Sequence, residues 1–330
     1  MNKVEVVLIM YNQTQLSMTV LSSRSKILSI LGLLTFLFTL EAVAQPNYPR
    51  EPKEAALIYS DLLHFMDAYK ALETNNDTIQ VLQTLYFERG SDGLKEFINR
   101  HQLTPEGLKD AMQAHPERYA LIPDFVSNIT EIEALYTDLM KRYHQVLPTA
   151  MYAPTYLLVG ANRGIGQASQ VGQLITITRV VDDRIKMQKI MTHELSHFQQ
   201  AMTMGGQKYV SLYTAPNNML GMCLREGGAE FITSLVLGGI TQDKALKYIE
   251  NDENKLKEQF LTDLDTQDKK FWLWDSIDQN SYPKLLGYAM GYQICKNYYE
   301  MSSDKSTALQ DILKMEDAEG FLKSSGYFKE

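Results

Sequence analysis

The segment that most constrains the fold of this chain runs from His193 to His197 and reads His-Glu-Leu-Ser-His. Residues four apart lie on one face of an α-helix, so the two imidazoles point in the same direction and can bind one metal ion. Glu194 lies between them, where a carboxylate can accept a proton from a water on that metal. A helix through this segment is therefore expected to face a third metal ligand.

The chemistry of zinc narrows the search for that ligand. Neutral imidazoles hold zinc in a tetrahedral site, and a catalytic site uses three protein ligands and leaves one position open. One large class of zinc proteins supplies a histidine six residues after the second one, but Thr203 stands at that position and no histidine follows His197. The third ligand is therefore expected to be an acidic residue, or to come from far upstream.

Glu226 is the best candidate for the third ligand, within Leu-Arg-Glu-Gly-Gly-Ala-Glu-Phe at 224–231. Gly227 and Gly228 each cost about 1 kcal/mol relative to Ala inside a helix, which indicates a close approach of two helices there. Glu230 shares the face of Glu226 and is placed to accept the Nδ1–H of a ligand histidine. Such a Glu pair is usually a solvated helix face, but its position after the two histidines favours a functional role.

The first 45 residues have the features of a signal peptide. Basic residues precede an apolar run, at 27–40, that is shorter than the roughly 20 residues of a membrane span. The small residues that end at Ala44 fit a cleavage pattern. We therefore expect cleavage after Ala44 and a mature chain without a membrane span, in the periplasm or outside the cell. Met18 would start a signal of ordinary length, and an uncleaved anchor is the alternative.

Composition bounds the partners of the chain. The net charge is −8 over 330 residues, and basic residues are scattered, which argues against nucleic acid as the main partner. After export, the two cysteines Cys223 and Cys295 would meet an oxidising compartment. They either form a disulfide or remain two buried thiols, and the sequence leaves both open.

Residues 46–150 predict a helical N-terminal region. Apolar residues recur there at helical spacing, and Thr104-Pro105 is typical of a helix start. The expected helices cover about 55–72, 79–87, 93–100, a segment from Pro105, and 125–143. Four histidines occur singly in this region and are interpreted as surface or hydrogen-bonded side chains rather than ligands: His64, His101, His115 and His144.

Residues 151–330 have a different pattern. Thr155–Val159 and Leu174–Thr178 predict two strands joined by a long glycine-containing loop. Asp182 or Asp183 is expected to cap a helix that runs to Met204. Further helices are expected over about 219–238, 241–264 and 283–301. The predicted fold class is α+β, mostly helical, with a small sheet whose edge strand precedes the helix of the two histidines.

These features resemble the gluzincin metallopeptidases. In that group a His-Glu-x-x-His helix is followed by a second helix whose glutamate completes the zinc site, often within Glu-Gly-x-Ala, and an acid four residues later orients a histidine. Here Glu226-Gly-Gly-Ala-Glu230 matches that pattern. The chain is most similar to a bacterial family of predicted zinc-dependent proteases seen in exported proteins, and the segment 286–292 resembles that family as well.

The resemblance implies a zincin-like catalytic region over 151–330 with zinc as its cofactor. It also implies a peptide or protein substrate, which would lie as an added strand along the Leu174–Thr178 strand. Tyr288 and Tyr292 are candidates for catalysis, because a tyrosine hydroxyl near the metal stabilises the oxyanion of a tetrahedral intermediate. Core packing is the simpler explanation for either tyrosine, and Arg225 is a weaker candidate.

A second motif points elsewhere and is rejected. The glycine-containing segment 160–166 resembles the cofactor loop of short-chain dehydrogenases, and Tyr292 and Lys296 mimic their Tyr-x-x-x-Lys pair. Such a loop must open a helix whose N-terminus binds pyrophosphate. Too few residues separate Gly166 from the next predicted strand for that crossover helix.

The sequence therefore predicts an exported zinc metallopeptidase. His193, His197 and Glu226 would hold zinc, and Glu194 would take a proton from zinc-activated water and pass it to the leaving amine. The alternative is a zinc-bearing binding or envelope-assembly protein that performs no hydrolysis. An open coordination position favours the enzyme, whereas a fourth protein ligand favours the binding protein.

Overall fold

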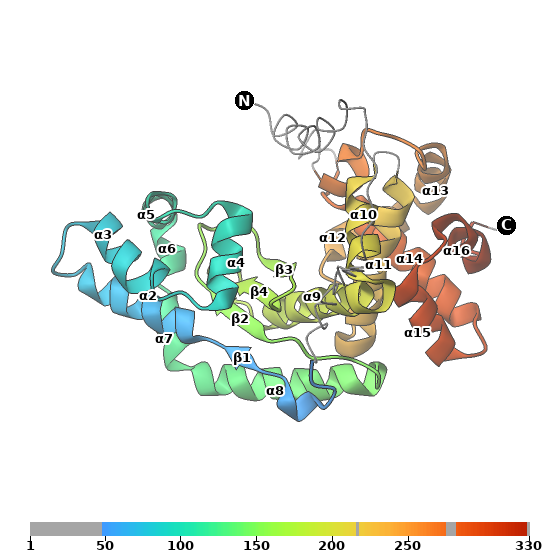
Figure 1. Cartoon of the computed structure of the whole chain (residues 1–330). Helices are drawn as coiled ribbons and strands as arrows, with labels where there is room; N and C mark the ends of the chain where they lie inside the picture. The colour runs from blue at the N-terminus through green and yellow to red at the C-terminus, as the bar shows by residue number, and fades with distance from the viewer. Residues whose placement is uncertain (1–47, 216–217, 275–281, 329–330) are drawn as a thin grey trace, which may run out of the picture. The chain divides into compact units, whose positions relative to one another are not determined.

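The computed structural model of the chain describes residues 48–215, 218–274 and 282–328, which belong to one compact unit that starts at Asn47. The predicted signal peptide and its cleavage point at Ala44 lie outside the described residues. The unit is mostly helical with one small sheet, as the α+β prediction requires (Figure 1). Its first half contains η1 (Pro52–Glu54), β1 (Leu57–Ile58), α2 (Ser60–Ala71), α3 (Thr78–Leu82), η2 (Gln83–Phe87), α4 (Asp92–His101), α5 (Pro105–Ala114), α6 (Pro116–Tyr119), α7 (Ile122–Ser127) and α8 (Ile129–Val146).

The helices expected before residue 150 are present, with two differences. The first expected helix begins only at Ser60, because Leu57–Ile58 pair with another strand instead. The last one is divided at Asn128, whose side-chain amide donates a hydrogen bond to the Asp124 carbonyl at 2.8 Å and ends α7 there. The predicted start at Thr104 is confirmed, since its hydroxyl accepts from the Gly107 N–H at 3.1 Å.

The sheet corrects the expected strand order. It contains β2 (Thr155–Leu158), β3 (Gly166–Ala168) and β4 (Gln173–Thr176) in the order β1-β2-β4-β3. The strand that precedes the histidine helix is β4, which pairs on both sides and is therefore not an edge. β3 lies at the edge beside it, antiparallel, and comes from the segment expected to be an irregular loop. It was missed because a strand of only three residues is too short to show the alternation of apolar and polar residues by which strands are predicted.

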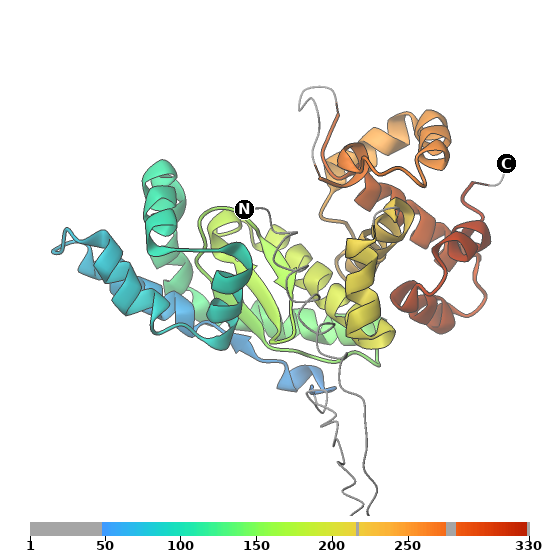
Figure 2. The same ribbon diagram turned by 45° about the horizontal axis from the view of Figure 1, so that its top comes forward.

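The register between β3 and β4 determines which of their side chains face each neighbouring helix. Residues directly opposite one another in an antiparallel pair share a face. Gly166 and its partner Ile175 therefore face the histidine helix α9 (Arg184–Met204), where a Cβ on Gly166 would meet Ile190. Gln167 is on the opposite face, beside α4. Figures 1 and 2 show α4 and α9 beside the sheet, and both helices contact β4.

The predicted boundaries of the histidine helix are confirmed. Asp183 caps α9 by accepting a hydrogen bond from the Lys186 N–H at 2.9 Å, and Gly205 ends the helix with a φ of 89°. The second half of the chain then contains α10 (Gly206–Thr214), α11 (Met219–Leu237), α12 (Asp243–Asn251), α13 (Glu253–Thr262), η4 (Lys270–Trp274), α14 (Leu286–Met301), α15 (Lys305–Lys314) and α16 (Ala318–Ser325).

Glycines set the crossing of α11 and α14. A Cβ on Gly227 would overlap the backbone of Gly291, and a Cβ on Gly291 would overlap the Cys223 carbonyl. Gly227 therefore allows the close approach expected of it, but the helix that approaches is α14 rather than α9. Gly228 instead faces α15 and α9, where a Cβ would lie 3.0 Å from the Ile312 side chain and 3.1 Å from the Gln200 amide nitrogen.

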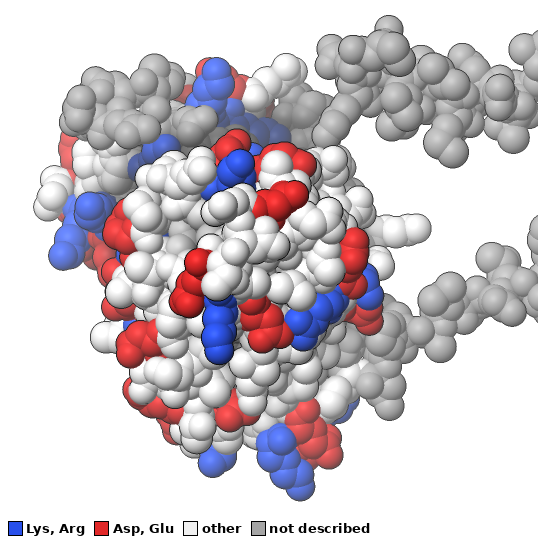
Figure 3. Space-filling view, turned by 90° about the vertical axis from the view of Figure 1, so that its left-hand side faces the viewer, with Lys and Arg blue, Asp and Glu red and all other residues white. Residues whose placement is uncertain are grey.

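Two further findings concern the cysteines and the surface. Cys223 and Cys295 are both buried free thiols, which decides between the two alternatives for them. No helix in the described ranges is long and apolar enough to cross a membrane. On the face in Figure 3, basic and acidic side chains alternate, and neither sign forms a continuous field there.

We predict that Gly291→Ala strongly destabilises the fold. The new methyl group meets backbone atoms of α11, which cannot move as a side-chain end can, so the two helices must separate. The expected loss is about 3 kcal/mol in the free energy of unfolding, measured by denaturant titration. Gly206→Ala is the matched control, since a Cβ there has no neighbour within 4 Å. Equal stability of the two variants would contradict the proposed crossing.

Candidate metal centre

Three side chains from two helices converge in the interior. His193 and His197 come from α9 and Glu226 from α11, and their candidate ligand atoms all lie within 4.8 Å of one another. The His197 Nε2 is 2.9 Å from the Glu226 Oε2 and 3.0 Å from the His193 Nε2. The His193 Nε2 is 3.3 Å from the same carboxylate oxygen. The three donor atoms thus surround one small volume.

This arrangement fits a zinc ion. Tetrahedral zinc with bonds of about 2.1 Å separates its donor atoms by roughly 3.4 Å. The observed separations of 2.9, 3.0 and 3.3 Å are slightly shorter, so a small outward shift of each side chain accommodates the ion. The donors are two imidazoles and one carboxylate, as in catalytic zinc sites. All three residues are buried, with exposed fractions of 7%, 5% and 4% for His193, His197 and Glu226.

Glu230 supports the first histidine. One carboxylate oxygen lies 3.2 Å from the His193 Nδ1, the ring nitrogen that faces away from the convergence point. Glu230 is itself fully buried and accepts hydrogen bonds from the Thr241 N–H, at 2.6 Å, and from the Thr241 hydroxyl. An acceptor at Nδ1 keeps the proton there and leaves the Nε2 lone pair for a metal.

Glu194 lies beneath the edge strand. A Cβ on Gly166 would come within 2.7 Å of the Glu194 side chain, so the absence of a side chain at Gly166 makes room for that carboxylate. The Ala168 backbone N–H is hydrogen-bonded to Glu194. The Gly160–Gly166 segment therefore enters strand β3 instead of opening a helix, which is a second reason to reject the dinucleotide loop.

The two candidate tyrosines occupy different surroundings. The Tyr288 ring is stacked on His193, with centroids 6.0 Å apart and planes within 8°, and its hydroxyl is hydrogen-bonded to Glu226. The Tyr292 ring instead packs on Phe231, with centroids 6.3 Å apart. Tyr288 is therefore the tyrosine that the glycine crossing of α11 and α14 brings to the metal centre.

Arg225 is fully buried beside the three candidate ligands. Its guanidinium lies 3.3 Å from the Glu226 Oε1 and 4.9 Å from the centre of the Tyr209 ring on α10. Burial lowers the pKa of Arg225 to about 10, an effect that the charge of Glu226 opposes. The guanidinium is thus still charged at neutral pH, and it leaves the other Glu226 oxygen facing the two histidines.

Electrostatics are strong because these groups are buried together. Burial by itself would lower the pKa of His193, but the carboxylates of Glu230 and Glu226 hold it well above its usual value. Burial would likewise raise the pKa of Glu226, yet His197, His193 and Arg225 hold it well below. Burial raises the pKa of Glu194 against the opposing effect of the histidines. Without a metal, a proton on His193 is therefore favoured, and it supplies positive charge that a bound cation would otherwise supply.

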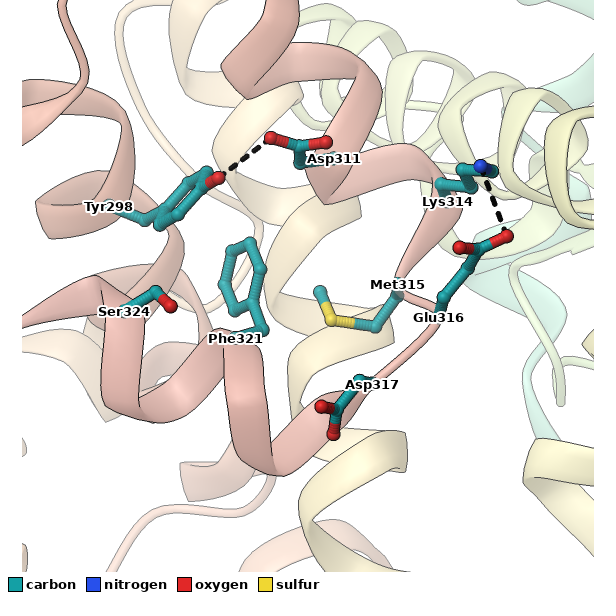
Figure 4. Close-up of a pocket in the computed structure, with 8 residues that line it drawn as sticks. All are labelled: Tyr298, Asp311, Lys314, Met315, Glu316, Asp317, Phe321 and Ser324. Carbon is teal, nitrogen blue, oxygen red and sulfur yellow. Dashed lines mark hydrogen bonds and ion pairs between the residues drawn. The ribbon is translucent and has the colours of Figure 1, made fainter.

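A pocket elsewhere in the structure does not include the His-His-Glu group. It has a volume of about 270 Å³ and lies between α14, α15 and α16 (Figure 4). Four of its lining residues form two polar pairs: the Tyr298 hydroxyl donates to Asp311 at 2.7 Å, and Lys314 lies 3.0 Å from Glu316. None of its lining residues belongs to the convergent group.

The fold and the site define a mostly helical protein in which a buried His-His-Glu group, able to bind a metal, lies beside a small sheet. The model of the family described as "Predicted Zn-dependent protease (DUF2268)" matches residues 133–322, more than half of the chain. The chain therefore belongs to this family, and zinc is the cofactor that both the family description and the ligand set support. No curated protein and no solved structure matches the chain.

Sequence reasoning overlooked several residues around this site. Thr241 contacts Glu230 of the preceding helix, and Tyr209 contacts Arg225 of the following one, so neither contact lies within a single helical repeat that a local pattern would mark. Gln200 was not among the predicted site residues, yet its side-chain oxygen lies 2.9 Å from the His197 Nδ1. The signal was present, since a residue three positions after a histidine lies on the same face of the helix.

We predict that zinc affinity rises steeply with pH. A raised pKa keeps a proton on His193 to higher pH than in a free histidine, and this proton competes with the metal. The dissociation constant should fall about tenfold per pH unit over a range that extends above pH 6.5. Chelator competition between pH 6 and 9 measures it. In the Glu230→Gln variant, the rise of zinc affinity with pH should occur at lower pH, because the neutral amide no longer raises the pKa of His193. A dissociation constant that stays flat over this range would contradict the prediction.

Proposed function

We propose that this protein is an exported zinc metallopeptidase. The observation that carries the proposal is the convergence of two imidazoles and a carboxylate next to Glu194, which lies under the edge strand of the sheet. The family description supports a protease at the coarse level. Export is proposed from the N-terminal apolar run and the cleavage pattern that ends at Ala44.

The residues of the chain have distinct roles in this proposal. Zinc held by the three ligands would supply Lewis-acid chemistry, by acidifying a water and polarising a carbonyl group. Glu194 would accept the proton of that water and pass it to the leaving amine. Burial raises the pKa of Glu194, which makes it a better proton carrier near neutral pH than a solvated carboxylate.

Tyr288 would stabilise the charge that develops on the carbonyl oxygen. Its hydroxyl is at the metal centre, where it contacts Glu226, and burial holds its pKa well above the usual value for tyrosine. The hydroxyl therefore keeps its proton across the physiological pH range and remains a hydrogen-bond donor. A donor fixed in a buried site is worth more than one in water.

Strand β3 would hold the substrate. It is an edge strand of the described sheet, it pairs only with β4 there, and it passes directly over Glu194. A peptide added along β3 would place its backbone beside the catalytic carboxylate. Its neighbour β4, expected earlier to bind the substrate, is already paired on both sides.

The alternative function is a zinc-bearing binding or envelope-assembly protein without hydrolysis. Within the described ranges, the group that can hold a metal has three members, His193, His197 and Glu226. Three protein ligands leave one position of tetrahedral zinc for a water, which favours the enzyme over the closed site of a structural protein.

We predict that Glu194→Gln abolishes turnover while zinc stays bound. The amide is isosteric with the carboxylate but cannot accept the proton, and Glu194 is not one of the three ligands. A loss of at least about a hundredfold in kcat is expected. The measurement is hydrolysis of a mixed peptide library by mass spectrometry, together with the zinc content of the purified variant. Full activity of a zinc-loaded variant would refute the mechanism.

We predict that the two tyrosines of α14 respond differently to loss of the hydroxyl. Tyr288→Phe removes the donor beside the metal centre and should lower kcat by about tenfold or more, with little change in KM. Tyr292→Phe is the matched variant, one helical turn away and packed on Phe231, and it should retain activity. The reverse order of the two effects would transfer the proposed role to Tyr292.

A further inference from the structure

We propose that Gln200 is a positioning residue of the metal centre. Its side chain keeps the proton of His197 on Nδ1 and links that histidine to α11, the helix that carries Glu226. The Gln200 side chain has an exposed fraction of 0% and lies between α9 and α11. Its Oε1 is 2.9 Å from the His197 Nδ1, and its Nε2 donates to the Arg225 carbonyl at 2.8 Å.

This pair of contacts determines where the protons are. A backbone carbonyl only accepts hydrogen bonds, so the Gln200 amide nitrogen must face Arg225 and its oxygen must face His197. The oxygen in turn only accepts, so the His197 Nδ1 carries the hydrogen. The Nε2 of the same ring, which points at Glu226 and His193, is then free of a proton in the neutral imidazole and can bind a metal.

The two ligand histidines are thus supported in chemically different ways. Glu230, a carboxylate on α11, lies at the Nδ1 of His193, whereas the neutral Gln200 on α9 itself lies at the Nδ1 of His197. Gln200 also reaches α11 at Arg225, the residue directly before the ligand Glu226. One side chain therefore sets both the orientation of an imidazole and the separation of the two ligand helices at the metal.

The local packing leaves space for this bridge. Gly228 stands where α11 passes the Gln200 amide, and a Cβ there would come within 3.1 Å of the Nε2. The absence of a side chain at Gly228 thus leaves room for the Gln200 amide. This contact also gives Gly228 a role different from that of Gly227, whose neighbour is α14.

The adjacent residue provides a matched control. Gln199 has an exposed fraction of 2% and also makes two hydrogen bonds to backbone, since its Oε1 accepts from the Met151 N–H at 2.9 Å and its Nε2 donates to the Met151 carbonyl at 2.7 Å. It does not contact a ligand histidine. Gln199→Met and Gln200→Met thus each remove a buried amide with two hydrogen bonds from the same helix, and only the second removes the acceptor at His197.

The test compares zinc affinity, measured by chelator competition on the purified full chain, with the unfolding midpoint of each metal-free variant. Gln200→Met should raise the zinc dissociation constant by about 10- to 100-fold relative to the unaltered protein. Gln199→Met should lower stability to a similar degree but leave zinc affinity within about twofold. Equal zinc affinities of the two variants would overturn the proposal.

A rescue variant tests the role of the acceptor. Gln200→Glu keeps an oxygen acceptor for the His197 Nδ1–H, so its zinc affinity should exceed that of Gln200→Met by about tenfold. If this variant folds and binds zinc as weakly as Gln200→Met, the acceptor role is wrong. If it does not fold, the comparison with Gln199→Met decides alone. Because the readout is metal affinity, loss of the proposed peptidase activity would leave this inference intact.

Discussion

The buried cluster of two imidazoles and two carboxylates is the constraint on which the rest of the structure depends. A carboxylate removed from water is costly unless it meets positive charge and hydrogen-bond donors. Glu226 faces both histidines and Arg225, and Glu230 meets His193 and Thr241. A divalent cation meets the same need without protons on imidazole. Metal binding and the stability of this part of the core are therefore coupled.

The packing of three helices converts that chemistry into a defined geometry. Helix α11 contacts α9 through Glu226 and Gly228, and it contacts α14 through Gly227. Because Gly227 and Gly291 have no side chains, α14 approaches closely enough for Tyr288 to stack on His193. A methyl group at this crossing would push α11 and α14 apart, and Tyr288 lies on the second of these helices.

The region before the family match also contributes to the site. The loop that leads into β3 is held by buried tyrosines of the first half, since the Tyr86 hydroxyl bonds both backbone groups of Val159 and the Tyr119 hydroxyl donates to the Gly160 carbonyl. His101 then bonds Gln167 of β3 itself at 2.7 Å. Residues before position 133 therefore hold the strand that passes over Glu194.

Local spacing was enough to place His193, Glu194 and His197 on one helix, to locate the caps of that helix and to nominate Glu226, because these features depend on periodicities of a few residues. Tertiary structure alone decided that β3 is the edge strand over Glu194, that α14 is the helix beside Gly227, and that Gln200 contacts His197. These features depend on which segments contact one another in the fold. A three-residue strand or a single glycine has no periodic pattern from which its partner can be predicted. Buried polar groups then select among the possible contacts, because each needs a partner and only the folded chain determines which one is within reach.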